Sequence, residues 1–184
     1  FLFVSTAAAV AQQGPTRRPT DERLPNLVVI FVDDMGYADI GPFGGSVPTP
    51  SIDRLAKEGM RFTDFHASSA VCSASRAALM TGCSHARVSV HGAYGPDATQ
   101  GIAASETTLA EICKQKGYAT ACVGKWHVGL TFQTAEGTPA YETKPPADLP
   151  GPERELARIR RVDFSKPLTD GPTHRGFDYF FGTA

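Results

Sequence analysis

The chain has 184 residues, a formal net charge of −1 and a hydrophobic fraction of 41%. These values are typical of one globular domain and exclude a collagen-like, coiled-coil or wholly disordered chain. The near-neutral charge argues against a nucleic-acid partner or a membrane surface bound by bulk electrostatics. The sequence has no run of about 18 apolar residues, so no membrane-spanning helix is predicted.

The first residues are apolar, and Ala9-Val10-Ala11 is a small-x-small step of the kind that signal peptidase cuts. We interpret residues 1–11 as a partial signal peptide, which predicts a periplasmic or secreted protein. A loosely packed N-terminal tail is the alternative interpretation. Residues 12–24 contain Pro15 and Pro19 and are predicted to be a linker.

Two strands and a helix are predicted next. Residues 27–32 form an apolar, β-branched run typical of a strand buried on both faces. Thr49-Pro50 and Gly59 bound a segment with helical periodicity. Residues 60–65 alternate apolar and polar side chains, which predicts a second strand.

Further along, a helix is predicted to begin just after Cys72 and to end near Gly82. Ser105 is the expected cap of another helix, with Leu109, Ile112 and Cys113 on its inner face. Residues 118–123 are predicted to be a third strand, and residues 153–161 a short exposed helix. The aromatic segment 177–182 is expected to pack against the rest. Strands alternating with helices favour a layered α/β fold.

Polar residues follow two of the predicted strands, and in open α/β sheets ligands bind beyond the carboxyl ends of strands. Asp33 and Asp34 follow the first strand, and adjacent carboxylates are costly unless a positive charge lies near them. Calcium, which takes oxygen ligands in an irregular cage, is one explanation. A solvated turn is the other.

Cys72 precedes a predicted helix, where the helix dipole favours an anion, and Arg76 lies about one turn further on. A buried thiol that acts only as a small hydrophobe is the alternative.

Lys125 and His127 follow the third strand. Lys125 can supply a positive charge for an oxyanion, and His127 can accept a proton. A surface loop anchored by Trp126 explains them equally well. Together these segments are expected to converge on one crevice. His66 is expected to be a satisfied core residue.

Several segments in the right order resemble the sulfatase family of the alkaline phosphatase superfamily. They are residues 26–45, 48–65, 72–82, 108–129 and 176–182. The resemblance implies an α/β alkaline phosphatase-like sandwich with a central, mostly parallel sheet, of which residues 25–184 are the N-terminal part of a truncated catalytic domain.

The resemblance also implies a role for each site residue. Asp33 and Asp34 would bind calcium, and Cys72, oxidised to formylglycine by a maturation enzyme, would touch the metal through its hydrate. Arg76 would polarise that hydrate. Lys125 would bind a sulfate oxygen, and His127 would hydrogen-bond the formylglycine.

The implied reaction is hydrolysis of a sulfated small molecule or carbohydrate. One hydroxyl of the hydrate would attack sulfur, and loss of the proton from the other would then expel sulfate. A phosphodiesterase or phosphonate monoester hydrolase of the same superfamily, or a non-catalytic pseudo-sulfatase, is the alternative. Ala74 departs from the commonest family motif, which has proline there, and so leaves the maturation system open. Family members are much longer, so the 184-residue chain alone is expected to be inactive.

Overall fold

The computed structural model describes residues 2–4, 24–95, 98, 100–140 and 148–183. Most of the predicted signal peptide and linker lies outside these residues. The chain divides into an N-terminal unit, Phe1–His66, and a C-terminal unit, Ala67–Ala184. No helix of the described residues is long and apolar enough to cross a membrane.

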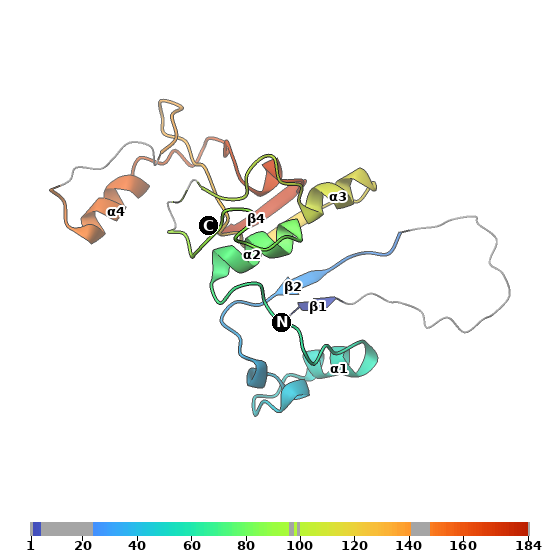
Figure 1. Ribbon diagram of the computed structural model, residues 1–184. Coiled ribbons are helices and arrows are strands. Elements are labelled where there is room, and N and C mark those ends of the chain that lie inside the picture. Colours follow the sequence, from blue (N-terminus) through green and yellow to red (C-terminus); the bar gives the residue numbers. More distant parts are fainter. Residues whose placement is uncertain (1, 5–23, 96–97, 99, 141–147, 184) are drawn as a thin grey trace. The chain divides into compact units, whose positions relative to one another are not determined.

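The described residues of the N-terminal unit form two short strands and one α-helix (Figure 1). β1 (Leu2–Val4) pairs antiparallel with β2 (Val29–Phe31), with Leu2 opposite Phe31. The prediction that β2 is buried on both faces is wrong, because Val29 and Ile30 are 40% and 56% exposed. The three residues of β1 pair with one edge of β2 and leave its apolar side chains uncovered.

The helix of the N-terminal unit, α1 (Pro50–Glu58), confirms the helix predicted between Thr49 and Gly59. Thr49 ties its first turn to the preceding loop, since its hydroxyl donates to Asp53 at 2.8 Å and accepts from the Gly41 N–H at 2.9 Å. Proline at the first helical position needs no N–H donor there. Two short 3-10 turns, Tyr37–Asp39 and Gly41–Phe43, precede it.

Residues 60–65 do not form the second strand that their alternation predicted. Within the described part of the chain no strand pairs with them, and a strand without a partner leaves its backbone hydrogen bonds unmade. Met60 and Phe62 are exposed. His66, expected in a core, is also exposed and lies 2.8 Å from the Asp64 carboxylate.

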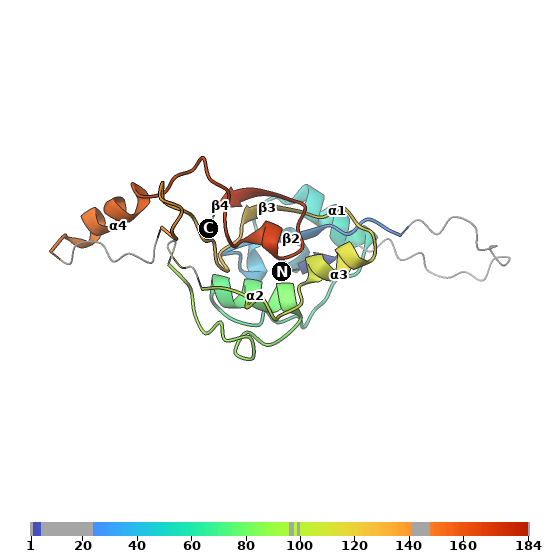
Figure 2. The same ribbon diagram turned by 90° about the horizontal axis from the view of Figure 1, so that it is seen from above.

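The C-terminal unit is built on a parallel strand pair, β3 (Ala121–Lys125) and β4 (Tyr179–Thr183), which lie side by side in Figure 2. β3 confirms the third predicted strand, shifted toward its C-terminal end. β4 comes from the aromatic segment that was expected only to pack. Gly182 lies opposite Gly124, and a Cβ added to Gly182 would be 1.8 Å from the Gly124 carbonyl oxygen. The close strand approach therefore requires glycine.

Where the structure describes it, the same unit also contains the α-helices α2 (Cys72–Thr81), α3 (Leu109–Gln115) and α4 (Gly151–Ile159). α2 ends at Gly82, which has φ 66°, as its glycine predicted. α3 begins later than expected, because Thr108 and not Ser105 is its cap. The expected inner face of α3 is wrong for Leu109 and Ile112, which are exposed, whereas Ala110 is buried.

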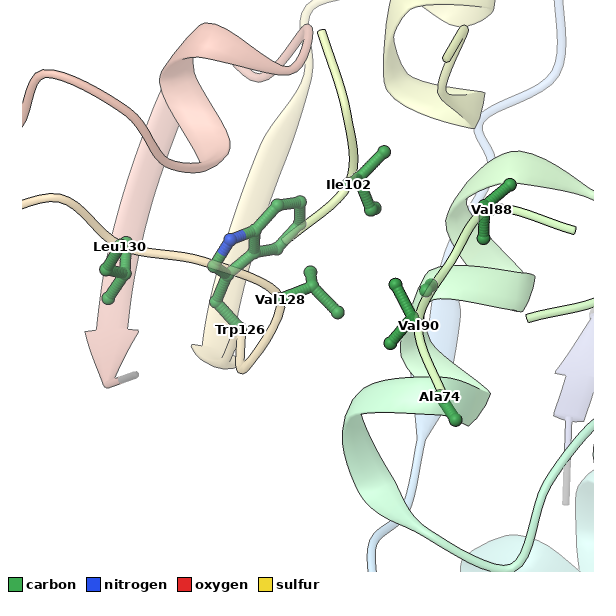
Figure 3. Close-up of a cluster of buried hydrophobic side chains, with 8 residues drawn as sticks. Ala74, Val88, Val90, Ile102, Trp126, Val128 and Leu130 are labelled. Carbon is green, nitrogen blue, oxygen red and sulfur yellow. The ribbon is translucent and has the colours of Figure 1, made fainter. Parts of the chain in front are cut away.

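The core of the C-terminal unit lies between α2 and the strand pair. Its buried side chains are Ala74, Ala77, Val88, Val90, Ile102, Trp126, Val128 and Leu130. Figure 3 shows the Trp126 ring beside Ile102 and Val128, with Val90 and Ala74 further toward α2. The rings of Phe177 and Trp126 pack edge to face, with their centroids 6.1 Å apart. The aromatic segment therefore does pack against this core.

Candidate active site

Cys72 is the first residue of α2 and is half-buried. The sequence placed it just before the helix, so the prediction is correct to one residue. The N–H groups of a first helical turn have no partner within the helix, and they make this end electropositive. The ten-residue helix therefore presents position 72 where a developing negative charge is stabilised.

Ala74 occupies the position where the family motif usually has proline. It is fully buried in the core. The Ser75 N–H donates to the Val71 carbonyl at 3.0 Å, so the helix takes its first hydrogen bond after Ala74 and needs no donor from it. Proline is tolerated for the same reason in a first turn. The exchange of proline for alanine is therefore compatible with the same helix start.

Arg76 joins α2 to the end of β3. Its side chain is nine-tenths buried, and its Nη1 donates to the Lys125 carbonyl oxygen at 2.6 Å. A carbonyl orients the guanidinium through a dipole and leaves the charge of the group in place. The guanidinium also acts on the Cys122 thiol. Burial raises the pKa of Cys122, and the charge of Arg76 opposes that shift.

Cys122 is therefore held as a neutral thiol that packs against the core. All four cysteines, Cys72, Cys83, Cys113 and Cys122, are free thiols in this structure. Among them, Cys72 is the one at a helix start, four residues before Arg76 on the same helix.

His127 reaches the start of α2 by a second route. Its Nε2 donates to the Tyr94 carbonyl oxygen at 2.7 Å, and the Tyr94 N–H donates to the Ser73 hydroxyl at 3.0 Å. Two hydrogen-bonded connections therefore link the end of β3 and the residues that follow it to the first two turns of α2. These bonds bring Arg76 and His127 together with α2 and the end of β3, and the convergence of the Cys72 and Lys125 side chains on one crevice stays a prediction.

The backbone of His127 is unusual, with φ 56°. A residue other than glycine in the left-handed region costs energy and persists where the surrounding structure holds it. Its Nδ1 is buried and has no hydrogen-bond partner among the described residues. Between His127 and Lys125, Trp126 is 3% exposed and donates from its indole N–H to the Gly129 carbonyl at 2.8 Å. The buried indole anchors the loop that carries His127. Lys125, which the sequence placed after the strand, is instead the last residue of β3.

Asp33 and Asp34 belong to the N-terminal unit and are exposed at the end of β2. Asp34 has φ 53°, a conformation that aspartate tolerates better than most residues. Their placement beside Cys72 stays a prediction. Adjacent carboxylates are the oxygen donors that calcium prefers, so the pair fits part of a calcium site. No group of three or more His, Cys, Asp or Glu side chains able to hold a metal occurs in the described ranges.

Ser73 and Tyr94 were missed from sequence. Ser73 lies inside the segment that carries the resemblance, but small residues are common at helix starts and gave no separate signal. Tyr94 contributes its backbone N–H and carbonyl, which every residue except proline has. Only the folding of the loop across α2 shows that these groups matter.

Comparison with known proteins gives the family of the chain. The family model described as Sulfatase matches residues 25–184. The chain is 37% identical to human Arylsulfatase G over 168 residues, which are 78% of the chain and 32% of the relative. It is 44% identical to human Arylsulfatase A over 131 residues, 70% of the chain and 24% of the relative.

A bacterial relative and a solved structure agree. Arylsulfatase of Klebsiella aerogenes is 38% identical over 134 residues, 69% of the chain and 28% of the relative. A solved structure, described with the metabolism of multiple glycosaminoglycans by Bacteroides thetaiotaomicron, is 34% identical with a TM-score of 0.61. That likeness covers 82% of the chain and 26% of the solved chain.

The chain thus spans 24% to 32% of the length of these relatives. The likeness to the solved structure gives it the alkaline phosphatase-like α/β fold, of which it holds one part, with the parallel pair β3–β4 and its covering helices. The family match over residues 25–184 and the identities of 37–45% are decisive. The chain belongs to the sulfatase family.

Proposed function

We propose that the whole protein to which this chain belongs hydrolyses sulfate esters, with Cys72 converted to formylglycine as the source of the nucleophile. The observation that carries the proposal is the pair of connections between α2 and the end of β3. One runs from Arg76 to the Lys125 carbonyl, and the other from Ser73 through Tyr94 to His127.

The proposal gives each residue a role. Arg76 and Lys125 supply positive charge near position 72, where the oxygens of a sulfate group gather charge as the ester is cleaved. His127 presents Nδ1 to take a proton or accept a hydrogen bond. An aldehyde hydrate at position 72 supplies two hydroxyls, one to attack sulfur and one whose deprotonation releases sulfate.

Calcium is the metal that the carboxylates of Asp33 and Asp34 fit. When bound, it would neutralise sulfate oxygens and lower the pKa of a nearby hydroxyl. Two carboxylates are fewer than the six to eight oxygens that calcium takes, so further ligands complete the proposed site. The supporting observation in this chain is the donor chemistry of the adjacent acidic pair.

The proposed substrates are sulfated small molecules or carbohydrates. The names of the relatives point to aryl sulfates, and the description of the solved structure mentions glycosaminoglycans. A maturation enzyme that oxidises Cys72 is a proposed partner. Export, to the periplasm or outside the cell, is proposed from the apolar run and small-residue step of residues 1–11.

Paired assays on the full-length protein test the activity. An aryl sulfate should be hydrolysed at least tenfold faster, in kcat/KM, than an aryl phosphodiester. The reverse order would favour the phosphodiesterase alternative. No turnover of either would favour a non-catalytic protein.

Mass spectrometry of the peptide containing Cys72 tests the modification. Formylglycine lowers the mass by about 18 Da relative to the thiol. The variant Cys72→Ala should lose both the mass change and the turnover, whereas Cys113→Ala, on α3, should keep both. A fully active protein with an unmodified thiol at position 72 would contradict the proposal.

A further inference from the structure

The hydrogen bond of His127 determines which of its two ring nitrogens is available. A carbonyl oxygen can only accept, so the bond to Tyr94 requires a proton on Nε2. In a neutral imidazole the other nitrogen then carries a lone pair. Nδ1 is buried and makes no hydrogen bond to any described residue. The ring therefore offers an acceptor that the surrounding protein leaves unused.

The Tyr94 carbonyl is itself held in place. The Tyr94 N–H donates to the Ser73 hydroxyl at 3.0 Å, and Ser73 is 0% exposed. Ser73 is the second residue of α2, directly after Cys72. A rigid helix turn thus fixes a loop peptide, and that peptide fixes the imidazole.

The backbone of His127 makes such support necessary. In the left-handed conformation, φ 56°, the residue has no strand or helix ladder of its own to hold it. Trp126 anchors the loop on one side of it. The hydrogen bond to the Tyr94 carbonyl orients the ring itself.

We propose that Ser73 is a positioning residue of the active site: through the Tyr94 peptide it holds His127 as the Nε2-protonated tautomer, with Nδ1 directed to the group at position 72. The catalytic consequence rests on the proposed function. The tautomer and the hydrogen-bonded path do not depend on it.

The test uses the full-length protein with Ser73→Ala, and Thr134→Val as a matched control. Thr134 is also buried, and its hydroxyl bonds to Thr138 in another part of the unit, so both variants lose one buried hydroxyl. Nitrogen-15 NMR of labelled histidines reports the tautomer of His127. Steady-state kinetics reports kcat and KM, with every rate divided by the formylglycine fraction at position 72, since Ser73 adjoins that residue.

In the wild type we expect the Nε2-protonated tautomer. Ser73→Ala should give a tautomer mixture and lower the corrected kcat by about five- to thirtyfold, the range expected for one lost hydrogen bond, with KM within about twofold. Thr134→Val should leave the tautomer and kcat unchanged.

An unchanged tautomer in Ser73→Ala would overturn the proposal. So would a loss of rate that disappears after correction for the formylglycine fraction, or an equal loss in Thr134→Val. If the wild type has no sulfatase turnover, the proposed function fails, and the NMR comparison still decides whether Ser73 positions His127.

Discussion

At the scale of single residues, the candidate site is organised by hydrogen bonds to main-chain carbonyls. The carbonyl of Lys125 orients Arg76, and that of Tyr94 orients His127. Such bonds fix the direction of a side chain while its charge or lone pair stays available for chemistry. Buried surroundings strengthen these contacts, because water does not compete for them.

Replacing His127 by glutamine separates anchoring from chemistry. The glutamine amide can still donate to the Tyr94 carbonyl, but it has no atom that accepts a proton in place of Nδ1. We expect His127→Gln in the full-length protein to lower kcat by about 10²- to 10⁴-fold, the usual contribution of a general acid or base. Steady-state kinetics on an aryl sulfate measures the effect.

The exposed His91 provides the control for this variant. His91→Gln should change kcat by less than about twofold, as surface substitutions usually do. The assignment of His127 would be wrong if His127→Gln kept more than a tenth of the wild-type kcat. The melting temperature of both variants should stay near that of the wild type.

At the scale of elements, the side chains of Thr108 and Asp178 connect α3 to the segments next to the strand pair. Thr108 caps α3 by accepting from the Glu111 N–H at 3.2 Å, while Glu111 accepts from the Thr108 N–H at 2.7 Å. The Thr108 hydroxyl also donates to the Arg175 carbonyl at 2.7 Å. One buried threonine therefore both starts the helix and ties it to the segment leading into β4.

Thr108→Ala removes the cap and leaves the Arg175 carbonyl without this donor. We expect it to lower the free energy of unfolding by about 1–3 kcal/mol. Ser105→Ala, at the exposed residue that the sequence favoured as the cap, should change it by less than about 0.5 kcal/mol. Denaturant unfolding of the full-length variants measures both values, and equal losses would show that Thr108 is not the cap.

Asp178 makes the second connection. Its carboxylate lies 2.7 Å from the Lys114 ammonium and accepts from the Thr120 N–H at 3.0 Å. Hydrogen bonds lower the pKa of Asp178 to about 2. The bond to Lys114 contributes most, and those to Thr120 come next. The carboxyl is therefore ionised in the folded protein at pH values where an unfolded chain has begun to bind a proton.

A lowered aspartate pKa gives stability that is complete above the unfolded value of about 3.9 and is lost as the pH falls through the folded value. Asp178→Asn should therefore lower the melting temperature most at neutral pH. The difference from wild type should shrink as the pH falls from about 4 toward 2. Thermal melts across this range check the sign, with the exposed Asp148→Asn as control. A difference that grows on acidification would contradict the role of Asp178.

At the scale of the whole molecule, the residues proposed for catalysis and those proposed for calcium belong to different units of the chain. Cys72, Arg76, Lys125 and His127 belong to the C-terminal unit, and Asp33 and Asp34 to the N-terminal unit. The chain spans 20% to 32% of the length of the relatives named Arylsulfatase G or A and of the bacterial arylsulfatase. Metal binding is therefore best tested in the full-length protein.

Removing calcium from the full-length protein with a chelator should abolish turnover and lower the melting temperature, because a ligand that binds only the folded state stabilises it. Added calcium should restore both. Asp33→Asn and Asp34→Asn should each weaken calcium binding at least tenfold by calorimetry, as each removes one charged oxygen ligand. Asp64→Asn, an exposed carboxylate beside His66, should bind calcium as the wild type does. Unchanged binding in both first variants would exclude the acidic pair as ligands.

The features that the sequence alone determined are those with local causes. Pro50 at a helix start, Gly82 in a left-handed cap and the β-branched run before Asp33 act within a few residues, so α1, α2 and β2 could be predicted. The ordered motifs around Cys72 and Lys125 also sufficed to indicate the family.

Tertiary structure decided the features that depend on distant partners. Thr108 rather than Ser105 caps α3, because the Thr108 hydroxyl also donates a hydrogen bond to the carbonyl of Arg175, far along the chain. Residues 179–183 form a strand because β3 offers them a partner, whereas residues 60–65 have none in the described ranges. The path from Ser73 to His127 runs through a backbone peptide, and no pattern of side chains in a sequence records where a backbone carbonyl will point.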